Sequence, residues 1–189
     1  MAESGASTAG KAGRFVLEIV LIVAAAIALT FLIRTFICQP FEIPSSSMED
    51  TIEIGDRVLS EKLTYLFTDI KQGDIVTFAD PTTSGRTLIK RVIATGGQTV
   101  EFIDDSVYVD GVKLNEPYTE GKATGPLPNT YNGMQISYPY TVPDGYLWVM
   151  GDNRTNSADS RFFGAVPASS VSGKAFFVYW PFNAFGYLN

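Results

Sequence analysis

The sequence predicts a mainly β domain preceded by one N-terminal transmembrane helix. Three observations support this fold class. A long apolar run lies between Phe15 and Ile33, interrupted only by Glu18 and Thr30. The rest of the chain is rich in aromatic residues (13%), with 17 Gly and 10 Pro, which favours a turn-rich β protein over a helical bundle. Several short runs of β-branched and aromatic residues are bounded by turn dipeptides.

The composition excludes several kinds of site. The 189 residues carry 14 basic and 20 acidic side chains, a formal net charge of −6, which argues against a nucleic acid partner. Histidine is absent, so a Ser-His-Asp triad, a Cys-His dyad and a His-ligated metal site are excluded. A single cysteine rules out intrachain disulfides and cysteine-cluster metal sites. We therefore expect neither a metal nor a cofactor.

The N-terminal apolar run has the length of a membrane anchor. As a helix it would span about 28 Å, close to the thickness of the hydrocarbon core. It is longer than the apolar region of a cleaved signal peptide, and it lacks the polar face of a soluble-core helix, the alternative interpretation. Lys11 and Arg14 precede it, which favours a cytoplasmic N-terminus. We expect a cytoplasmic tail over 1–14, a single-pass plasma-membrane anchor over 15–34 and an extracytoplasmic domain over 35–189.

The remaining elements follow in order along the extracytoplasmic part. A short helix is expected over 60–67, and Asp110-Gly111 predicts a hairpin turn. The region 116–143 is an expected insertion, formed by loops or a small hairpin subdomain. The aromatic tail 176–188 is expected in the core, with a membrane-resting patch as the alternative. Strands are expected over 74–78, 87–94, 99–103, 107–109, 146–150 and 174–180.

Three separated polar clusters are candidates for chemistry. The first is the serine run after Pro44, close behind the apolar segment. The second is the basic pair Lys90-Arg91 inside an apolar strand, where one of the two side chains must lean toward the core. The third is the polar loop 151–161 after a hydrophobic strand. The plainer interpretations are a polar loop, an edge strand protected by charge, and a simple turn.

Without histidine, a serine nucleophile needs a lysine or a carboxylate as its base. A lysine pKa must fall from about 10.4 toward 7–8, which requires roughly 4 kcal/mol of differential destabilisation of the charged form. Burial among apolar side chains supplies shifts of that size. Lys90 is the lysine embedded in a clearly apolar strand, so a Ser-Lys dyad is the natural hypothesis.

Four segments in this order, after one anchor, resemble the bacterial type I signal peptidases (leader peptidases), in their single-anchor Gram-positive form. Pro44-Ser45-Ser46-Ser47-Met48 resembles the nucleophile box, and Gly55 to Leu59 the strand that follows it. Ile89-Lys90-Arg91 resembles the general-base box, and 151–161 the most distinctive box of the family. One departure is Asp50, which occupies a position where the family often has proline.

The resemblance implies a set of roles and a fold. Ser47 would be the nucleophile and Lys90 the general base, with Ser157 orienting Lys90. The backbone N–H of Ser47 and the hydroxyl of Ser45 would form the oxyanion hole. The fold implied is a set of coiled antiparallel sheets forming a barrel-like catalytic core. Structural support is implied for Asp152 with Arg91, Asp159 with Arg161, and Gly151.

The resemblance also implies the reaction and its substrate. The activity would be removal of signal peptides from secretory precursor proteins at the membrane surface, by cleavage after Ala-x-Ala-like sites. Shallow apolar pockets would exclude larger side chains. The expected pocket lining is Phe41, Ile43, Met48, Ile52, Leu88 and Ile89, with ordinary core packing as the alternative for each. Two other functions remain open, a self-cleaving Ser-Lys protease and an anchored, non-catalytic binding domain.

Overall fold

A computed structural model describes residues 5–188 of the chain, with side chains from residue 13 onward. The chain divides between Gln39 and Pro40 into two compact units, which are described separately below.

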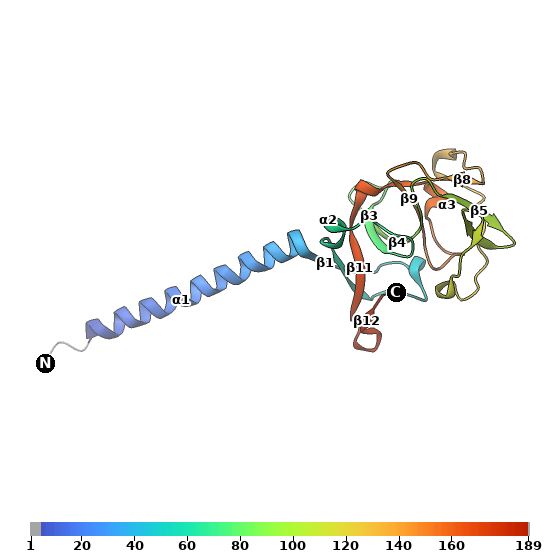
Figure 1. The fold of residues 1–189 in the computed structure, drawn as a ribbon. Coiled ribbons are helices and arrows are strands. Elements are labelled where there is room, and N and C mark those ends of the chain that lie inside the picture. The colour runs from blue at the N-terminus through green and yellow to red at the C-terminus, as the bar shows by residue number, and fades with distance from the viewer. Residues whose placement is uncertain (1–4, 189) are drawn as a thin grey trace. The chain divides into compact units, whose positions relative to one another are not determined.

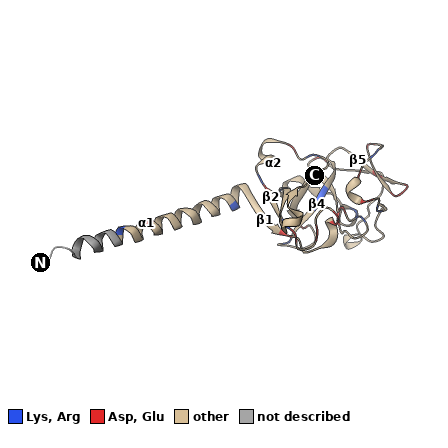
Figure 2. Ribbon diagram, turned by 90° about the horizontal axis from the view of Figure 1, so that it is seen from below, with Lys and Arg blue, Asp and Glu red and all other residues tan. Residues whose placement is uncertain are grey.

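The first unit is dominated by one long helix (Figure 1). Helix α1 (Gly5–Leu32) continues into the π-helical turn η1 (Ile33–Ile37). The stretch Gly13–Ile37 has a mean hydropathy of 2.9 and no buried residues, so it is long and apolar enough to cross a membrane. It carries almost no charge between its ends (Figure 2). The hydroxyl of Thr30 donates to the carbonyl of Ala26 at 2.8 Å, which satisfies it within the helix.

The second unit is built on a curled antiparallel sheet (Figure 1). Its strand order is β1-β2-β11-β3-β4-β9-β10, with β12 pairing β11 as well. Register shifts in β11 against both β2 and β3, and in β4 against β9, bend the sheet on itself. The strands are β1 (Cys38–Glu42), β2 (Arg57–Glu61), β3 (Ile75–Ala79), β4 (Thr87–Thr95), β9 (Tyr146–Met150), β10 (Val166–Pro167), β11 (Val171–Trp180) and β12 (Gly186–Tyr187).

A smaller sheet, ordered β7-β6-β5-β8, packs against β4 and β9 of the large one. Its strands are β5 (Thr99–Ile103), β6 (Ser106–Val109), β7 (Val112–Lys113) and β8 (Tyr140–Thr141). The β6–β7 turn is the predicted hairpin. Both turn residues have positive φ, 52° at Asp110 and 76° at Gly111, as this turn requires.

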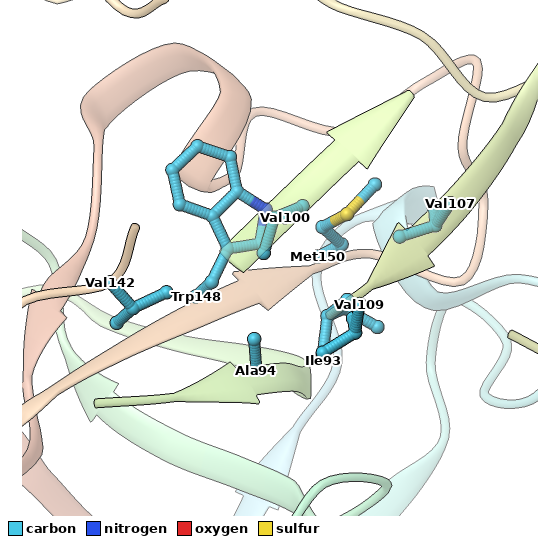
Figure 3. Close-up of a cluster of buried hydrophobic side chains, with 8 residues drawn as sticks. All are labelled: Ile93, Ala94, Val100, Val107, Val109, Val142, Trp148 and Met150. Atoms are coloured by element: carbon cyan, nitrogen blue, oxygen red, sulfur yellow. The ribbon is translucent and has the colours of Figure 1, made fainter. Parts of the chain in front are cut away.

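Buried side chains from both sheets meet in one cluster around Trp148 (Figure 3). Trp148 and Met150 come from β9 and Ile93 from β4, while Val100 and Val107 come from the small sheet. The cluster therefore joins the strand that carries Lys90 and the strand that leads into the polar loop 151–161. Both strands owe their fixed position to this apolar packing.

Short helices complete the unit. They are α2 (Thr64–Phe67), α3 (Ser160–Phe163) and the 3₁₀ turns η2 (Ser46–Met48), η3 (Pro117–Thr119), η4 (Tyr131–Gly133), η5 (Ala168–Ser170) and η6 (Phe182–Ala184).

The predicted strands are confirmed to within three residues at each end. The short helix expected before β3 and the edge-strand alternative for Lys90-Arg91 differ from the structure. The helix expected over 60–67 begins only at Thr64, because Ser60 and Glu61 pair with β11. An edge position for the Lys90-Arg91 strand is wrong, since β4 lies between β3 and β9. Both basic side chains are buried.

The expectation of a core position for the aromatic tail is wrong for most of its rings. Trp180, Phe182, Phe185 and Tyr187 are exposed, because they lie at and beyond the last β11–β2 pair, Trp180 with Arg57. They pack on neighbouring rings of the same tail instead, with centroid distances of 4.7 to 5.0 Å.

Candidate active site

The serine and the lysine predicted as a dyad are in contact. The Nζ atom of Lys90, on β4, donates to the Oγ atom of Ser47, in η2, at 2.5 Å. The two residues are 43 positions apart in sequence. Figure 2 shows the basic stretch of β4 inside the domain. This geometry fits a nucleophile and its base, which must lie within hydrogen-bond reach.

Burial prepares Lys90 for that role. Its side chain is only 2% exposed, and this desolvation lowers the pKa of Lys90 to about 8. The carboxylates of Asp159 and Asp152 act in the opposite direction and raise its pKa. The effect of burial is larger, so about a tenth of Lys90 is neutral at pH 7 and about half at pH 8. A neutral amine can accept a proton from a serine hydroxyl.

Two buried ion pairs hold the loops around the dyad. Arg91 donates from Nε and from a terminal nitrogen to Asp152 at 2.9 and 2.7 Å. Asp152 also accepts a hydrogen bond from Thr51 at 2.6 Å. One carboxylate thereby links β4, the polar loop and the segment after Ser47.

The second pair, Asp159 with Arg161, stiffens the far end of the polar loop. Arg161 makes two side-chain hydrogen bonds to Asp159, at 2.9 and 2.8 Å. Asp159 also accepts from the backbone N–H groups of Arg161 and Gly151. All of these groups are buried, so each charge is satisfied by bidentate partners rather than by water.

Gly151 allows the polar loop to approach the nucleophile closely. A Cβ atom at this position would overlap the carbonyl oxygen of Ser47 and the hydroxyl of Ser157, and it would lie 2.7 Å from Ser157 Cβ. Only glycine fits without a shift of backbone. This is a steric requirement, since its φ is not in the left-handed region.

Ser45 and Ser157 are the residues with the least defined contacts. Ser45 is exposed, has extended backbone angles and makes no capping hydrogen bond among the described residues. The Oγ atom of Ser157 is buried beside Gly151 but has no hydrogen-bond partner within residues 13–188. The expected hydrogen bond from Lys90 to Ser157 is therefore not formed here, because Nζ is directed to Ser47.

The expected pocket residues fall into two groups. Met48 and Ile52 are fully buried and Ile43 is 3% exposed, so these three are core residues here. Phe41 and Ile89 are half-buried at the edge of the same cluster. Leu88 is half-buried but packs on a different cluster, around Phe78 and Val92.

Sequence reasoning missed two asparagines that fasten the nucleophile loop. Asn153 donates from its side chain to the carbonyl of Ser46 at 3.0 Å and from its backbone to that of Ser47 at 3.2 Å. Asn156 donates to the hydroxyl of Ser46 at 2.8 Å. Both lie inside the polar loop already singled out, but nothing in the sequence indicated their partners.

The hydrogen-bond partners of Arg154 were also not predicted from the sequence. This buried arginine donates to both carboxylate oxygens of Glu116, at 2.9 and 2.6 Å, and to the carbonyl of Gly151 at 3.0 Å. Glu116 begins the predicted insertion. No group of three or more acidic or cysteine side chains that could hold a metal ion occurs in the described part of the chain.

Comparison with known proteins places this geometry in a family. The profile of the family described as signal peptidase, peptidase S26, matches residues 16–180. Probable signal peptidase I-1 of Synechocystis is 39% identical over 182 residues, covering 93% of this chain and 88% of that protein. Signal peptidase I of Mycobacterium tuberculosis H37Rv is 33% identical over 217 residues, covering 89% of this chain and 74% of that protein.

Among solved structures, a signal peptidase I from Enterococcus faecalis V583 is 34% identical in sequence. The match covers 57% of this chain and 97% of the Enterococcus chain, with a TM-score of 0.47.

Proposed function

We propose that this chain, which belongs to the peptidase S26 family of signal peptidases, removes N-terminal signal peptides with Ser47 as nucleophile and Lys90 as general base. The observation that carries the proposal is the 2.5 Å contact between Lys90 Nζ and Ser47 Oγ inside a buried site. Family membership favours a peptidase over a non-catalytic binding domain.

The reaction follows from the dyad. Neutral Lys90 takes the proton of the Ser47 hydroxyl as its oxygen attacks the carbonyl carbon of the scissile peptide bond. The ammonium of Lys90 then gives that proton to the leaving amine, and an acyl-serine remains. Lys90, neutral again, takes a proton from water as the water oxygen attacks the ester carbon. Its ammonium then returns that proton to the departing serine oxygen, which releases the carboxylic acid product and restores the Ser47 hydroxyl and the neutral amine.

The oxyanion and orienting roles are assigned to two further serines. The backbone N–H of Ser47 and the hydroxyl of Ser45 would donate to the oxygen that becomes negative. The exposed position of Ser45 leaves its hydroxyl able to rotate toward a substrate carbonyl. Ser157 would accept from Lys90 when Ser47 has lost its proton, because its buried hydroxyl lacks another partner among the described side chains.

The substrate would reach the site at the membrane surface. Ser47 follows Ile37, the last residue of the apolar stretch, by ten positions, so a fully extended chain allows at most about 35 Å between them. With the N-terminus in the cytoplasm, the catalytic unit faces the outer surface, where a precursor presents its cleavage site. The half-buried Phe41, Leu88 and Ile89 would limit the side chains accepted and favour Ala-x-Ala sites.

The function is tested by mass spectrometry of a purified secretory precursor incubated with the full chain in detergent and lipid. We expect one cut after an Ala-x-Ala site with the wild type, and none with Ser47→Ala. Ser169→Ala, an exposed serine on η5, serves as the matched control and should cut normally. A folded wild type that leaves the precursor intact would refute the proposed function. Cleavage by Ser47→Ala would refute the nucleophile.

A further inference from the structure

One segment of the insertion touches every buried arginine of the site. We name residues 116–125 the strap. Its Glu116 pairs with Arg154, and its Thr124 hydroxyl accepts from the same guanidinium at 3.3 Å. The carbonyl of Gly125 accepts from Arg161 at 3.4 Å. The ring of Tyr118 lies against the guanidinium of Arg91, whose Cζ atom is 3.9 Å from the ring centroid.

Tyr118 occupies the centre of these contacts. The Cζ atom of Arg91 lies 3.9 Å from the centroid of its ring, and that of Arg154 lies 5.8 Å from it. Its hydroxyl donates to Glu116 at 3.0 Å. Burial raises the pKa of the Tyr118 hydroxyl, so it remains a donor at any pH at which the enzyme works. The tyrosine thus contacts one arginine through its ring and a second through Glu116.

The strap is fixed at points away from the arginines. The backbone N–H of Thr124 donates to the carbonyl of Asp105, beside the small sheet, at 2.9 Å. Lys122 pairs with Asp50, three residues after the nucleophile. The strap therefore joins the small sheet to the catalytic loops, and the strap residues that meet the arginines cannot move independently of the site.

A short chain of contacts leads from Tyr118 to both members of the dyad. Arg91 directly follows Lys90 on β4, and it holds Asp152. Asp152 binds Thr51, four residues after Ser47. Since the guanidinium of Arg91 has a planar face, an aromatic ring packed on it fixes its orientation as well as its position.

We propose that Tyr118 is a positioning residue of the peptidase, which fixes Arg91 and through it the relative placement of Lys90 and Ser47. Tyr118 does not act on the substrate. This inference rests on the proposed function of the same site. It assigns to the insertion a role in catalysis, not only in covering the core.

If Tyr118 positions Arg91, its removal should raise the pKa of Lys90, which the loss of a merely structural tyrosine would not do. The charged groups that act on Lys90 are Asp159, Asp152, Asp80 and Arg86. Arg91 keeps its two hydrogen bonds to Asp152 and the one to the carbonyl of Gly73 at 3.1 Å when the ring is removed. The face of its guanidinium is then no longer packed, so Arg91 tilts more freely and neutralises Asp152 less completely. Lys90 then faces more negative charge, its ammonium is stabilised, and the acid limb of the rate profile moves to higher pH.

The test compares Tyr118→Leu with Tyr118→Phe in the full chain. Tyr118→Phe keeps the ring and loses only the hydroxyl, so it should retain activity within about threefold. For Tyr118→Leu we expect kcat to fall about five- to thirtyfold, the range from a partly exposed to a desolvated cation–π contact. KM should stay within about twofold, because Tyr118 does not touch the substrate. Should Tyr118→Leu fail to fold, Tyr118→Met takes its place.

A second readout does not depend on cleavage. Lysine-labelled protein allows the titration of Lys90 to be followed by NMR, with Lys90→Arg to assign its signal. We expect the Lys90 titration to move upward in Tyr118→Leu and to stay in place in Tyr118→Phe. A folded Tyr118→Leu protein with unchanged titration overturns the inference, whether or not the wild type cuts a precursor. Failure of the wild type to cut, with the shift present, refutes only the proposed function.

Discussion

At the scale of single residues, the proposed chemistry depends on the burial of one lysine, Lys90. A lysine on the surface would be protonated at neutral pH and useless as a base. Lys90 is placed by apolar strand packing, and its pKa falls to about 8 because burial outweighs the two nearby carboxylates. The apolar strand around it singled out Lys90, whereas Ser47 was chosen by the resemblance to signal peptidases, and the structure brings the two into contact. Residue types and order were not enough to predict that Asn153 and Asn156 hold the nucleophile loop, because those bonds join residues more than a hundred positions apart.

The first prediction concerns pH. Only neutral Lys90 accepts the proton of Ser47, so kcat/KM should rise with pH and level off above the Lys90 pKa of about 8. Below that value the rate should fall about tenfold per pH unit. Initial rates with a fluorogenic signal-peptide substrate between pH 6 and 10 measure this. A flat profile over that range, with chemistry limiting, would contradict the role of Lys90.

The second prediction concerns Gly151. Gly151→Ala forces the polar loop away from Ser47 and Ser157, so we expect a loss of kcat of about a hundredfold, as misplacement of catalytic groups produces. Overpacking should also lower stability by about 1–3 kcal/mol. The control is Gly186→Ala, where the nearest atom lies 3.9 Å from the new Cβ. Equal activity of the two variants would show that the close approach is dispensable.

At the scale of elements, the strands were more predictable than the segments between them. Strands β4, β5 and β9 follow alternating or continuous apolar runs, and the structure begins each at the predicted residue. The insertion was recognised only as Gly- and Pro-rich sequence. Its contacts with Arg91 and Arg154 could not be predicted, since they depend on how two sheets pack around Trp148. The tail was misjudged because aromatic content alone does not tell core packing from ring-on-ring contact at a surface.

The third prediction belongs to the polar loop as an element. Arg161→Ala leaves the carboxylate of Asp159 buried and unpaired, so we expect a loss of stability of about 3–5 kcal/mol. Arg57→Ala breaks an exposed pair with Glu42 and should cost less than about 1 kcal/mol. Denaturant unfolding of the two variants beside the wild type measures both values. Similar losses would mean that the Asp159–Arg161 pair does not stabilise the loop.

At the scale of the whole molecule, a helix long and apolar enough to cross a membrane precedes a β-rich peptidase unit. Sequence alone predicted a helix of membrane-spanning length and the mainly β class, because hydropathy and strand patterning act locally. Curling of the sheet depends on register shifts in β4 and β11, which no local pattern indicates.

The fourth prediction concerns topology. We expect Lys113→Cys, on the exposed strand β7, to react with a membrane-impermeant maleimide in intact spheroplasts, in a Cys38→Ser background. The reason is the proposed cytoplasmic N-terminus, which would put the residues after the anchor outside. Labelling should be as strong before lysis as after it. Labelling that requires lysis would reverse the proposed orientation.

The Ser-Lys mechanism is tested most directly by the kcat of Lys90→Ala for precursor cleavage, measured beside that of Lys113→Ala. Lys113 is an exposed lysine, so its removal should leave kcat within about twofold of the wild type. Loss of the base should lower kcat by about 10²–10⁴ in a protein with unchanged circular dichroism and melting temperature. A folded Lys90→Ala protein that still cleaves at the wild-type rate would contradict the Ser-Lys mechanism.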